Sequence, residues 1–358
     1  MKENGPIVTV VIAARPGQAE VKAVAAARAL DYPADKLEII VARGKQPSVQ
    51  RNTAIKAARG EWIYFLDDDS VAHPANLRRA IPHFQNPKVK MLGGPNLCPP
   101  DAPALEQVFA LVLASKLAFG PSCARYSPVG TVRETSEKEL ILCNLVARRD
   151  ALLELGGFNE ALYPNEENAL MDELQKSGGK LIYDPDFIVY RRPRPSLRAF
   201  ARMLMTYGRG RAEQFRLHPT FGSTLNFVPP LFLVYLLATL LLLAVIPAVG
   251  KFLLVPLALY ALVVGAQAVA LMENREPQAA DQKTPTKPTA GLSVKVARAL
   301  AAIPLIVLTH VLYGFGFWRG LMTTLKPPEK RAPVPVVLEN VPVREKGLAK
   351  LRPDRDGD

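Results

Sequence analysis

The chain has 358 residues, 49% of them hydrophobic, and a formal net charge of +12, which allows one substantial domain and a further region. Its cysteines, Cys98, Cys123 and Cys143, are odd in number and lack CxxC spacing, so we expect neither a disulfide framework nor a zinc site. The arginines are concentrated just before an apolar stretch and no nucleic-acid recognition motif accompanies them, so we do not expect nucleic acid as a partner.

Strand and helix patterns alternate along the first 200 residues. Short apolar runs predict strands at residues 7–13, 37–41, 61–66, 89–92 and 140–147. Helical patterns are found at residues 19–30, from Pro47 with Ser48 as its cap to Gly60, from Pro74, at 104–119 and at 149–155. This alternation predicts an α/β domain over residues 1–195, with a mostly parallel, Rossmann-like sheet covered by helices on both faces. The first apolar run is too short for a signal peptide, so we expect this domain in the cytoplasm.

The predicted strand 61–66 ends in three adjacent carboxylates, Asp67, Asp68 and Asp69. In open α/β sheets, ligands bind in the crevice beyond the carboxyl ends of the strands. Three neighbouring negative charges repel one another unless a divalent cation or several donors neutralise them. We therefore expect a cation or ligand site here, the alternative being a solvated acidic turn.

The second half of this domain combines a long loop with a carboxylate pair. Residues 120–136 are rich in Gly, Pro, Ser and Thr, and a loop of this length inside a compact domain is usually functional. Glu166 and Glu167 precede a helix predicted at 169–176, where the helix dipole favours carboxylates in any case. Strands are predicted at 181–183 and 187–190.

A basic segment, residues 196–224, leads into the apolar part of the chain. Eight arginines lie between Arg191 and Arg216, against the single acid Glu213. Cationic residues that flank a membrane span stay cytoplasmic and are attracted to anionic headgroups. The pattern of Leu197, Ala201 and Leu204 predicts an amphipathic helix, which either lies at a membrane interface or packs on the domain.

Three apolar stretches follow, two of them with the length of a membrane span. Residues 227–247 and 252–272 predict a transmembrane hairpin over 225–272 with its turn at Gly250-Lys251. A polar linker is expected at 273–298 and a third apolar helix at 299–322. If the third helix also spanned, the basic tail would lie outside, against the positive-inside rule. A re-entrant or interfacial helix is the alternative, and the Pro- and charge-rich tail 323–358 is expected to be disordered.

Several short motifs together resemble the inverting family 2 glycosyltransferases of the GT-A fold. These motifs are Arg51-Asn52-Thr53-Ala54, Ala58-Arg59-Gly60-Glu61, Phe65-Leu66-Asp67-Asp68-Asp69, Arg148-Arg149-Asp150, Gly156-Gly157-Phe158-Asn159-Glu160 and Asn165-Glu166-Glu167. The branch with membrane-anchored succinoglycan-type glucosyltransferases is similar in three further segments, around Tyr190-Arg191-Arg192, Tyr207-Gly208-Arg209 and Tyr313-Gly314-Phe315. Their shared order makes the resemblance specific, and it extends to about residue 322.

The resemblance implies a nucleotide-sugar donor, most simply a UDP-sugar, and a divalent metal, Mg²⁺ or Mn²⁺, that neutralises the departing diphosphate. Asp69, with Asp67 or Asp68, would hold the metal, since two carboxylates and phosphate oxygens suffice. The remaining aspartate, Asp67 or Asp68, would bind the donor. Candidate partners for its phosphates or base are the arginines Arg15, Arg43 and Arg51, each of which could equally be a surface charge.

The same resemblance implies a catalytic base that removes the acceptor hydroxyl proton, Glu167 ahead of Glu166. We expect transfer of one hexose to a lipid-linked or membrane-associated glycan by a multi-pass protein of the inner membrane, with its catalytic domain on the cytoplasmic side. Two departures from the family stand out: Arg43-Gly44 replaces the Asp that often ends the second strand, and Glu167 replaces an Asp. They support an alternative, a catalytically degenerate scaffold of a membrane polysaccharide assembly complex.

Overall fold

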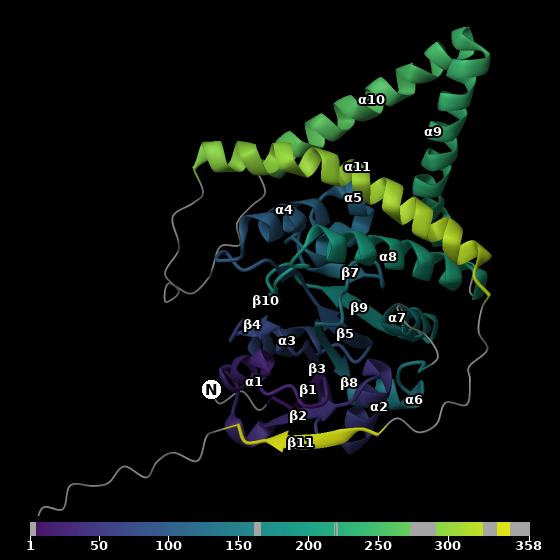
Figure 1. Ribbon diagram of the computed structural model, residues 1–358. Coiled ribbons are helices and arrows are strands. Elements are labelled where there is room, and N and C mark those ends of the chain that lie inside the picture. Colours follow the sequence, from purple (N-terminus) through teal and green to yellow (C-terminus); the bar gives the residue numbers. More distant parts are fainter. Residues whose placement is uncertain are drawn as a thin grey trace, which may run out of the picture.

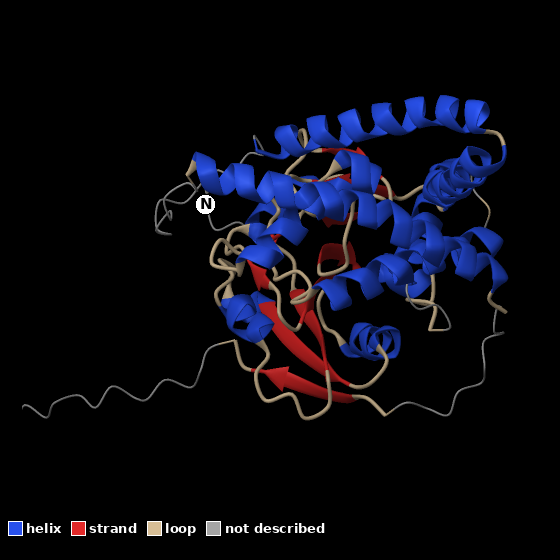
Figure 2. Ribbon diagram, turned by 45° about the horizontal axis from the view of Figure 1, so that its top comes forward, coloured by secondary structure: helices blue, strands red, loops and turns tan. Residues whose placement is uncertain are grey.

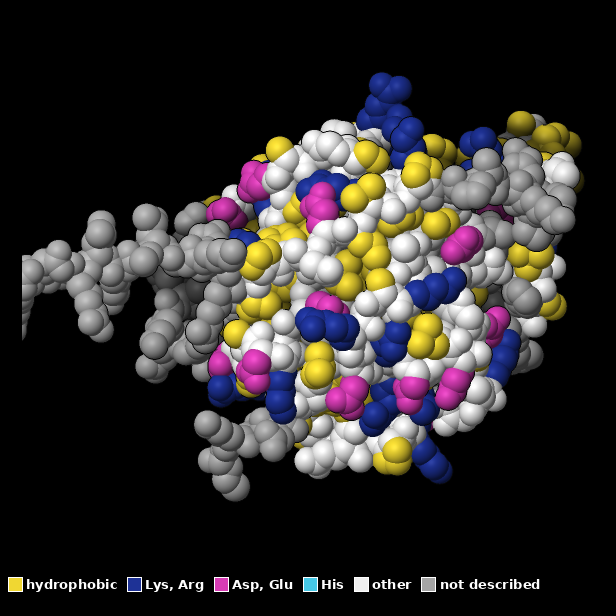
Figure 3. Space-filling view, turned by 90° about the horizontal axis from the view of Figure 1, so that it is seen from below, with side chains coloured by type: hydrophobic (Ala, Val, Ile, Leu, Met, Phe, Trp, Pro, Cys, Tyr) yellow, Lys and Arg dark blue, Asp and Glu magenta, His cyan; other side chains and the backbone are white. Residues whose placement is uncertain are grey.

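The computed structural model describes residues 5–160, 166–217, 219, 221–272, 291–324 and 335–343 (Figure 1). An α/β domain forms one part, and long apolar helices lie along one side of it. On the face turned away from those helices, lysine and arginine side chains are interspersed with aspartate and glutamate (Figure 3).

Over the described ranges, the main sheet has eight strands in the order β11-β2-β1-β3-β8-β5-β9-β7. Their bounds are β1 (Val8–Ala14), β2 (Leu37–Arg43), β3 (Trp62–Asp67), β5 (Val89–Gly93), β7 (Arg133–Thr135), β8 (Asn144–Arg148), β9 (Lys180–Tyr183) and β11 (Val337–Val341). The pairs β1/β2, β1/β3 and β5/β9 are parallel, whereas β7, β8 and β11 run antiparallel to their neighbours. The predicted α/β fold is confirmed, as a mixed sheet. A second, small sheet joins β4 (Val71–Ala72), β10 (Val189–Tyr190) and β6 (Asn96–Leu97).

Helices cover both faces of the main sheet because side chains of each strand alternate between two cores. In β1, Val10 and Ile12 face one core, with α1 (Lys22–Arg28) and α3 (Asn76–His83), while Val11 faces the other. That second core contains the helices α2 (Pro47–Ala57), α6 (Arg149–Glu154) and α7 (Glu166–Lys176). Figure 2 shows the strands of the domain with helices around them. A short turn of 3₁₀-helix, η1 (Ala34–Lys36), precedes β2.

Two local predictions in this domain are wrong. The helix predicted at 104–119 is broken into α4 (Ala104–Leu113) and α5 (Lys116–Phe119), and α5 continues into the 3₁₀-helix η2 (Gly120–Arg125). The bend of 60° lies between α4 and the segment Lys116–Arg125. The break occurs because Ser115 leaves the helical conformation and its side chain caps α5 by accepting from the Ala118 N–H. The predicted cap Ser48 is a buried residue within α2, whose N-cap residue is Gln46.

The basic segment forms α8 (Leu197–Leu217), which packs along the 31-residue helix α11 (Leu292–Met322). The two backbones touch at Gly208, where an added Cβ would lie 2.1 Å from the Tyr313 carbonyl oxygen. Only a residue without a side chain permits this approach. One face of α8 therefore packs against the protein, as the second alternative predicted. Arg198 and Arg202 of the same helix are exposed.

Among the described residues, three helices are long and apolar enough to cross a membrane: the segment 224–245 containing α9 (Val228–Val245), α10 (Pro247–Met272) and α11. The α9/α10 pair projects from the rest of the structure as a hairpin (Figure 1), preceded by η3 (Phe221–Phe227). Its turn lies at Ile246-Pro247 and not at the predicted Gly250-Lys251, because Pro247 begins the next helix. Residues 273–290 of the predicted linker lie outside the described residues, and 292–298 belong to α11.

The tail predicted to be disordered contributes a strand. β11 pairs antiparallel with β2 and completes the sheet edge, with Val336 and Leu338 packed against one core and Val341 and Val343 against the other. An exposed strand edge offers unpaired backbone groups, and β11 satisfies those of β2. The rest of the tail, 325–334 and 344–358, lies outside the described residues.

Candidate functional site

A cavity of about 1520 Å³ opens at the carboxyl ends of β1, β2 and β3 and continues to the apolar helices. At the sheet its lining includes Arg15, Asp67 and Asp68, which we call the donor end. At the helices it includes Asn226 before α9 and Tyr313 on α11, which we call the acceptor end. One continuous space therefore connects the expected acidic site with the helices that could enter a membrane.

Asp67 pairs with two arginines at the donor end. Its carboxylate accepts from Arg51 Nη2 at 3.1 Å and pairs with Arg191 Nη1 at 3.0 Å, and Arg191 Nε reaches Asp69 Oδ1 at 2.6 Å. Burial alone would raise the pKa of Asp67, but the positive charges of Arg191 and Arg51 outweigh it and lower the pKa below its ordinary value. Asp67 is therefore held ionised.

Arg191 is a site residue that sequence reasoning missed, because it was grouped with the arginines before the membrane segment. It directly follows β10, and its backbone N–H donates to the Leu97 carbonyl at 2.9 Å, which continues the β10/β6 pairing. This small sheet carries Arg191 to the end of β3. Its position immediately after a predicted strand, as for Asp67, was the available signal.

The aspartates fit a divalent cation through their donor chemistry. Two carboxylates, of Asp67 and Asp69, converge on a single cationic group, the Arg191 guanidinium, and carboxylate oxygens are the ligands that Mg²⁺ and Mn²⁺ prefer. Asp68 lines the cavity, whereas Asp69 lies beside its lining residues. Among the described residues no group of three or more His, Cys, Asp or Glu side chains could hold a metal ion, so phosphate oxygens would have to complete the coordination.

Glu166 and Glu167 were predicted to precede a helix, but in the structure they lie within the first turn of α7. Glu166 is buried, with Oε1 3.5 Å from Arg51 Nη1, and within the part of the chain that the structure describes Oε2 has no hydrogen-bond partner. Burial, and then the charge of Glu167, raise the pKa of Glu166 to about 7. Glu167 is half-buried and lines the cavity. Arg51 thus bridges Asp67 to Glu166. Asp67 at the end of β3 and the glutamates of α7 therefore line the same part of the cavity.

The three arginines predicted to bind the donor are separated by the structure. Arg15 and Arg51 line the cavity. Arg43 lies beside it, with Nε 2.5 Å from Glu339 Oε1 and Nη1 donating to the carbonyls of Gln18 and Arg15 at 2.7 and 3.3 Å. Arg43 therefore holds the loop that carries Arg15.

The motif Gly156-Gly157-Phe158 fixes α2 to the chain that leads to the glutamates. Asn52 donates to the Phe158 carbonyl and accepts from the Phe158 N–H, both at 2.8 Å. Gly157 has φ +81°, and a Cβ there would lie 2.4 Å from Asn52 Oδ1, so glycine is needed for both reasons. Since Arg51 directly precedes Asn52, these two hydrogen bonds also help to position Arg51.

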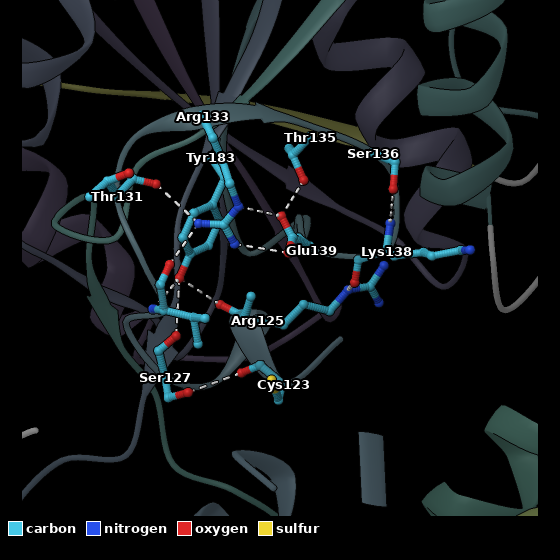
Figure 4. Close-up of polar contacts among 12 residues, drawn as sticks. Cys123, Arg125, Ser127, Thr131, Arg133, Thr135, Ser136, Lys138, Glu139 and Tyr183 are labelled. Carbon is cyan, nitrogen blue, oxygen red and sulfur yellow. Dashed lines mark hydrogen bonds and ion pairs between the residues drawn. The ribbon is translucent and has the colours of Figure 1, made fainter. Parts of the chain in front are cut away.

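The segment predicted to be a functional loop, residues 120–136, contains η2 and the strand β7, and its first part, residues 120–126, contributes to the cavity wall. Figure 4 shows Tyr183 and the ion pair of Arg133 with Glu139 at its centre. The Tyr183 hydroxyl accepts from the Val129 N–H at 3.2 Å and lies 3.0 Å from the Ser127 carbonyl. The loop is thus tied to β9 and presents Arg125 to the cavity.

Comparisons with known proteins agree with the predicted fold. Residues 1–206 match the family described as glycosyltransferase like family 2. The chain is 27% identical over 177 residues, 49% of its length, to the pre-mycofactocin glycosyltransferase of Mycobacterium tuberculosis (strain ATCC 25618 / H37Rv), and 28% identical over 222 residues, 61% of its length, to the succinoglycan biosynthesis protein ExoA of Rhizobium meliloti (strain 1021). The matched segments cover 36% and 57% of those relatives, so the chain spans only part of their lengths.

Two solved structures are similar at low identity. The mannosyltransferase PcManGT from Pyrobaculum calidifontis, in complex with GDP-Man and Mn²⁺, has a TM-score of 0.49 at 16% identity, over 88% of this chain and 87% of that one. S. aureus TarS 1-349 in complex with UDP-GlcNAc has a TM-score of 0.40 at 12% identity, over 62% and 78% of the two chains.

Proposed function

The chain belongs to the family 2 glycosyltransferases, and on that basis we propose that it moves a single hexose, with inversion, from a nucleotide sugar to a lipid-linked or other membrane-associated glycan. The observation that carries the proposal is the continuous cavity, with ion-paired carboxylates at its donor end and candidate membrane helices at its acceptor end. Such a cavity suits a polar donor from solution and an acceptor from a membrane.

The donor end would bind the nucleotide sugar, a UDP-sugar in the simplest case. Asp67 and Asp69 would hold Mg²⁺ or Mn²⁺, which supplies neutralisation of the charge that develops on the diphosphate. Asp68 and Arg15 line the same end and would contact ribose and phosphate. Arg51 is kept in place by Asp67 and Glu166, which leaves it close to the developing charge.

Glu167 would be the catalytic base. It lines the cavity and is half-buried, so an acceptor hydroxyl can reach it. The hydroxyl oxygen forms its bond to the anomeric carbon as the bond to the diphosphate oxygen breaks, and the proton passes to Glu167. Glu166, which is buried against Arg51, would position Arg51 and restrain Glu167.

The apolar helices would anchor the domain at the cytoplasmic face of the inner membrane. The α9/α10 hairpin would span, with its exposed leucines and valines in lipid. α11 is followed by β11, which belongs to the sheet of the domain, and it packs along α8. This supports an interfacial α11 and keeps the basic tail on the cytoplasmic side.

A scaffold without catalytic activity is the second candidate, and one observation favours it. The Arg191 guanidinium sits between Asp67 and Asp69, so a built-in cation already neutralises the carboxylates that a metal would need. In an active enzyme Arg191 would have to move away from them when the donor arrives.

The test is Mn²⁺-dependent consumption of a panel of UDP-, GDP- and dTDP-sugars by the detergent-solubilised full-length chain. We expect one donor to be consumed, and its turnover to fall by about a hundredfold or more in Asp69→Ala and in Glu167→Gln. Glu173→Gln, an exposed position on the same helix as Glu167, is the matched control. Turnover that survives both changes contradicts the site assignment, and no turnover of any donor by wild type favours the scaffold.

A further inference from the structure

Two neighbouring arginines belong to the acceptor end of the cavity. Arg125 on η2 and Arg211 on α8 both line it. Arg125 donates to the Asn168 side chain at 2.7 Å and to the Lys138 carbonyl at 2.9 Å, and Arg211 donates to Gln214 at 3.0 Å. Neither guanidinium forms an ion pair with a carboxylate of the described residues.

This arrangement is electrostatically unfavourable without a ligand. Burial, and then the positive charge of Arg125, lower the pKa of Arg211. The acidic groups that act on Arg211 are Glu137 and Glu167, both of which line the cavity at more than ion-pair distance. Two guanidinium groups held together in a partly buried space form a site for a doubly charged anion, because planar, multidentate donors suit phosphate oxygens.

The contacts around the two arginines are specific. Tyr126 beside Arg125 meets Tyr207, one helical turn before Arg211, with 3.5 Å between their hydroxyl oxygens. Arg125 itself is fixed by the backbone of residues 137 and 138, as the close-up in Figure 4 shows for Lys138. The loop 120–136 and helix α8 are therefore joined at this point, and the two cations are placed by packing.

The surroundings indicate where the anion comes from. The same cavity is also lined by Val228 and Pro229 of α9 and by Tyr313 of α11. Along α9, Leu231, Val234 and Leu237 are exposed, as expected of a helix in contact with lipid. An anion at the two arginines would thus have an apolar exit toward the membrane on one side and the proposed base Glu167 on the other.

We infer that Arg125 and Arg211 bind the phosphate or diphosphate ester through which a membrane lipid carries the acceptor glycan. This inference rests on the proposed glycosyl transfer and names the headgroup chemistry of its acceptor. Anchored there, the ester fixes how far the glycan extends along the cavity, and so which hydroxyl reaches Glu167.

The experiment titrates three probes into the full-length chain in maltoside micelles by calorimetry: farnesyl diphosphate, inorganic pyrophosphate and farnesol. Wild type should bind farnesyl diphosphate at least about tenfold more tightly than either other probe, since both charge and chain contribute. Arg125→Gln and Arg211→Gln should each weaken that binding by about tenfold to a hundredfold. Arg202→Gln, an exposed arginine on the same helix as Arg211, is the matched control and should leave it unchanged.

Each other outcome overturns part or all of the inference. Unchanged affinity in both variants removes the anion site, and equal affinity for inorganic pyrophosphate removes the lipid source. Arg211→Lys retains the charge and should keep most of the binding, which covers a glutamine variant that fails to fold. Donor consumption measured on the same samples should persist in the control Arg202→Gln. Its absence in wild type would contradict the proposed function separately.

Discussion

The two ends of the cavity differ in how their charges are compensated. At the donor end, Asp67 and Asp69 are paired with Arg191, and Arg51 joins Asp67 to Glu166. At the acceptor end, the arginines Arg125 and Arg211 lie together with no carboxylate in an ion pair among the described residues. At the donor end, opposite charges are therefore already paired before a ligand binds. At the acceptor end, the positive charges are available to pair with an anionic ligand.

The difference follows from which elements build each end. The donor end lies where strands of the sheet stop, so its side chains are placed by backbone pairing. The acceptor end is made by a loop and by helices outside the sheet, α8, α9 and α11. A site made by separate elements can be altered by shifting one helix, whereas the donor end is held mainly by strand pairing.

The largest effect is expected from Asp67→Asn, which removes the balance at the donor end. Arg51 and Arg191 would both lose a charged partner, so the donor end would come to resemble the acceptor end. We expect kcat/KM for the consumed donor to fall by about a thousandfold, roughly 4 kcal/mol. Steady-state assays at saturating Mn²⁺ measure this, with the exposed Asp186→Asn as control. A loss of less than tenfold would show that Asp67 does not organise the site.

The next effect concerns the dependence of stability on pH, in which the two carboxylates bridged by Arg51 differ. The folded-state pKa of Glu166 is raised to about 7. The contribution of protonated Glu166 to the free energy of unfolding is therefore fully present below the unfolded pKa near 4.5 and is lost as pH rises through about 7. For Asp67 the pKa is lowered, so its contribution is present above its unfolded value and lost on acidification. At pH 8, Glu166→Gln should therefore stabilise the chain by up to roughly 3 kcal/mol.

Thermal unfolding in detergent between pH 5 and pH 8 tests this. The wild-type chain should lose stability toward pH 8 relative to Glu166→Gln, and the two should converge near pH 5. Glu173→Gln on the same helix is the control for a change of one formal charge. Parallel curves for wild type and Glu166→Gln would mean that the buried carboxylate is ionised at little cost.

A change at the contact of α8 with α11 should act on the acceptor end alone. In Gly208→Ala the new Cβ would lie 2.1 Å from the Tyr313 carbonyl oxygen, so the helices must separate, at a cost of about 2 kcal/mol. Because Arg211 lies one turn further along α8, transfer should fall while donor hydrolysis persists. Gly265→Ala on α10, with nothing within 4 Å of the new Cβ, is the matched control. Equal loss of hydrolysis and transfer would contradict the separation of the two ends.

The sequence predicted the donor end better than the acceptor end, for a physical reason. Strand β3 is a continuous apolar run that stops at Asp67, so its element type and its end can both be read locally. Arg191 is one of eight arginines in a short segment, and only the pairing of β10 with β6 distinguishes it. The pairing of Arg125 with Arg211 depends on how separate helices pack, which no local pattern encodes.

The largest error, the tail strand β11, has the same origin. Residues 337–341 are a short run between proline- and charge-rich segments, where composition favours disorder. What makes them a strand is the free edge of β2, almost 300 residues earlier in the chain. A strand of this kind is determined by its partner, so a local pattern could not reveal it.

The smallest expected effect comes from this strand and tests how firmly the donor end is fixed. Glu339 on β11 pairs with Arg43, which donates to the carbonyls of Gln18 and Arg15 in the loop at the cavity mouth. The Glu339 side chain is 42% exposed, so the pair contributes at most about 1 kcal/mol. In Glu339→Gln the loop should be held less firmly, and the KM for the donor should rise by about threefold to fivefold with kcat unchanged.

A glutamate at the opposite edge of the same sheet provides the control. Glu134 on β7 pairs with Lys180 at 2.6 Å and is similarly exposed, but it lies away from the donor end. Glu134→Gln should leave KM unchanged, and Glu339→Asp should restore part of the affinity because the charge is retained. An equal rise of KM in both glutamine variants would mean that sheet edges affect the donor end only through general stability. A fall in kcat with KM constant would instead place the influence of β11 on the chemical step, and would contradict its assigned effect on the loop that carries Arg15.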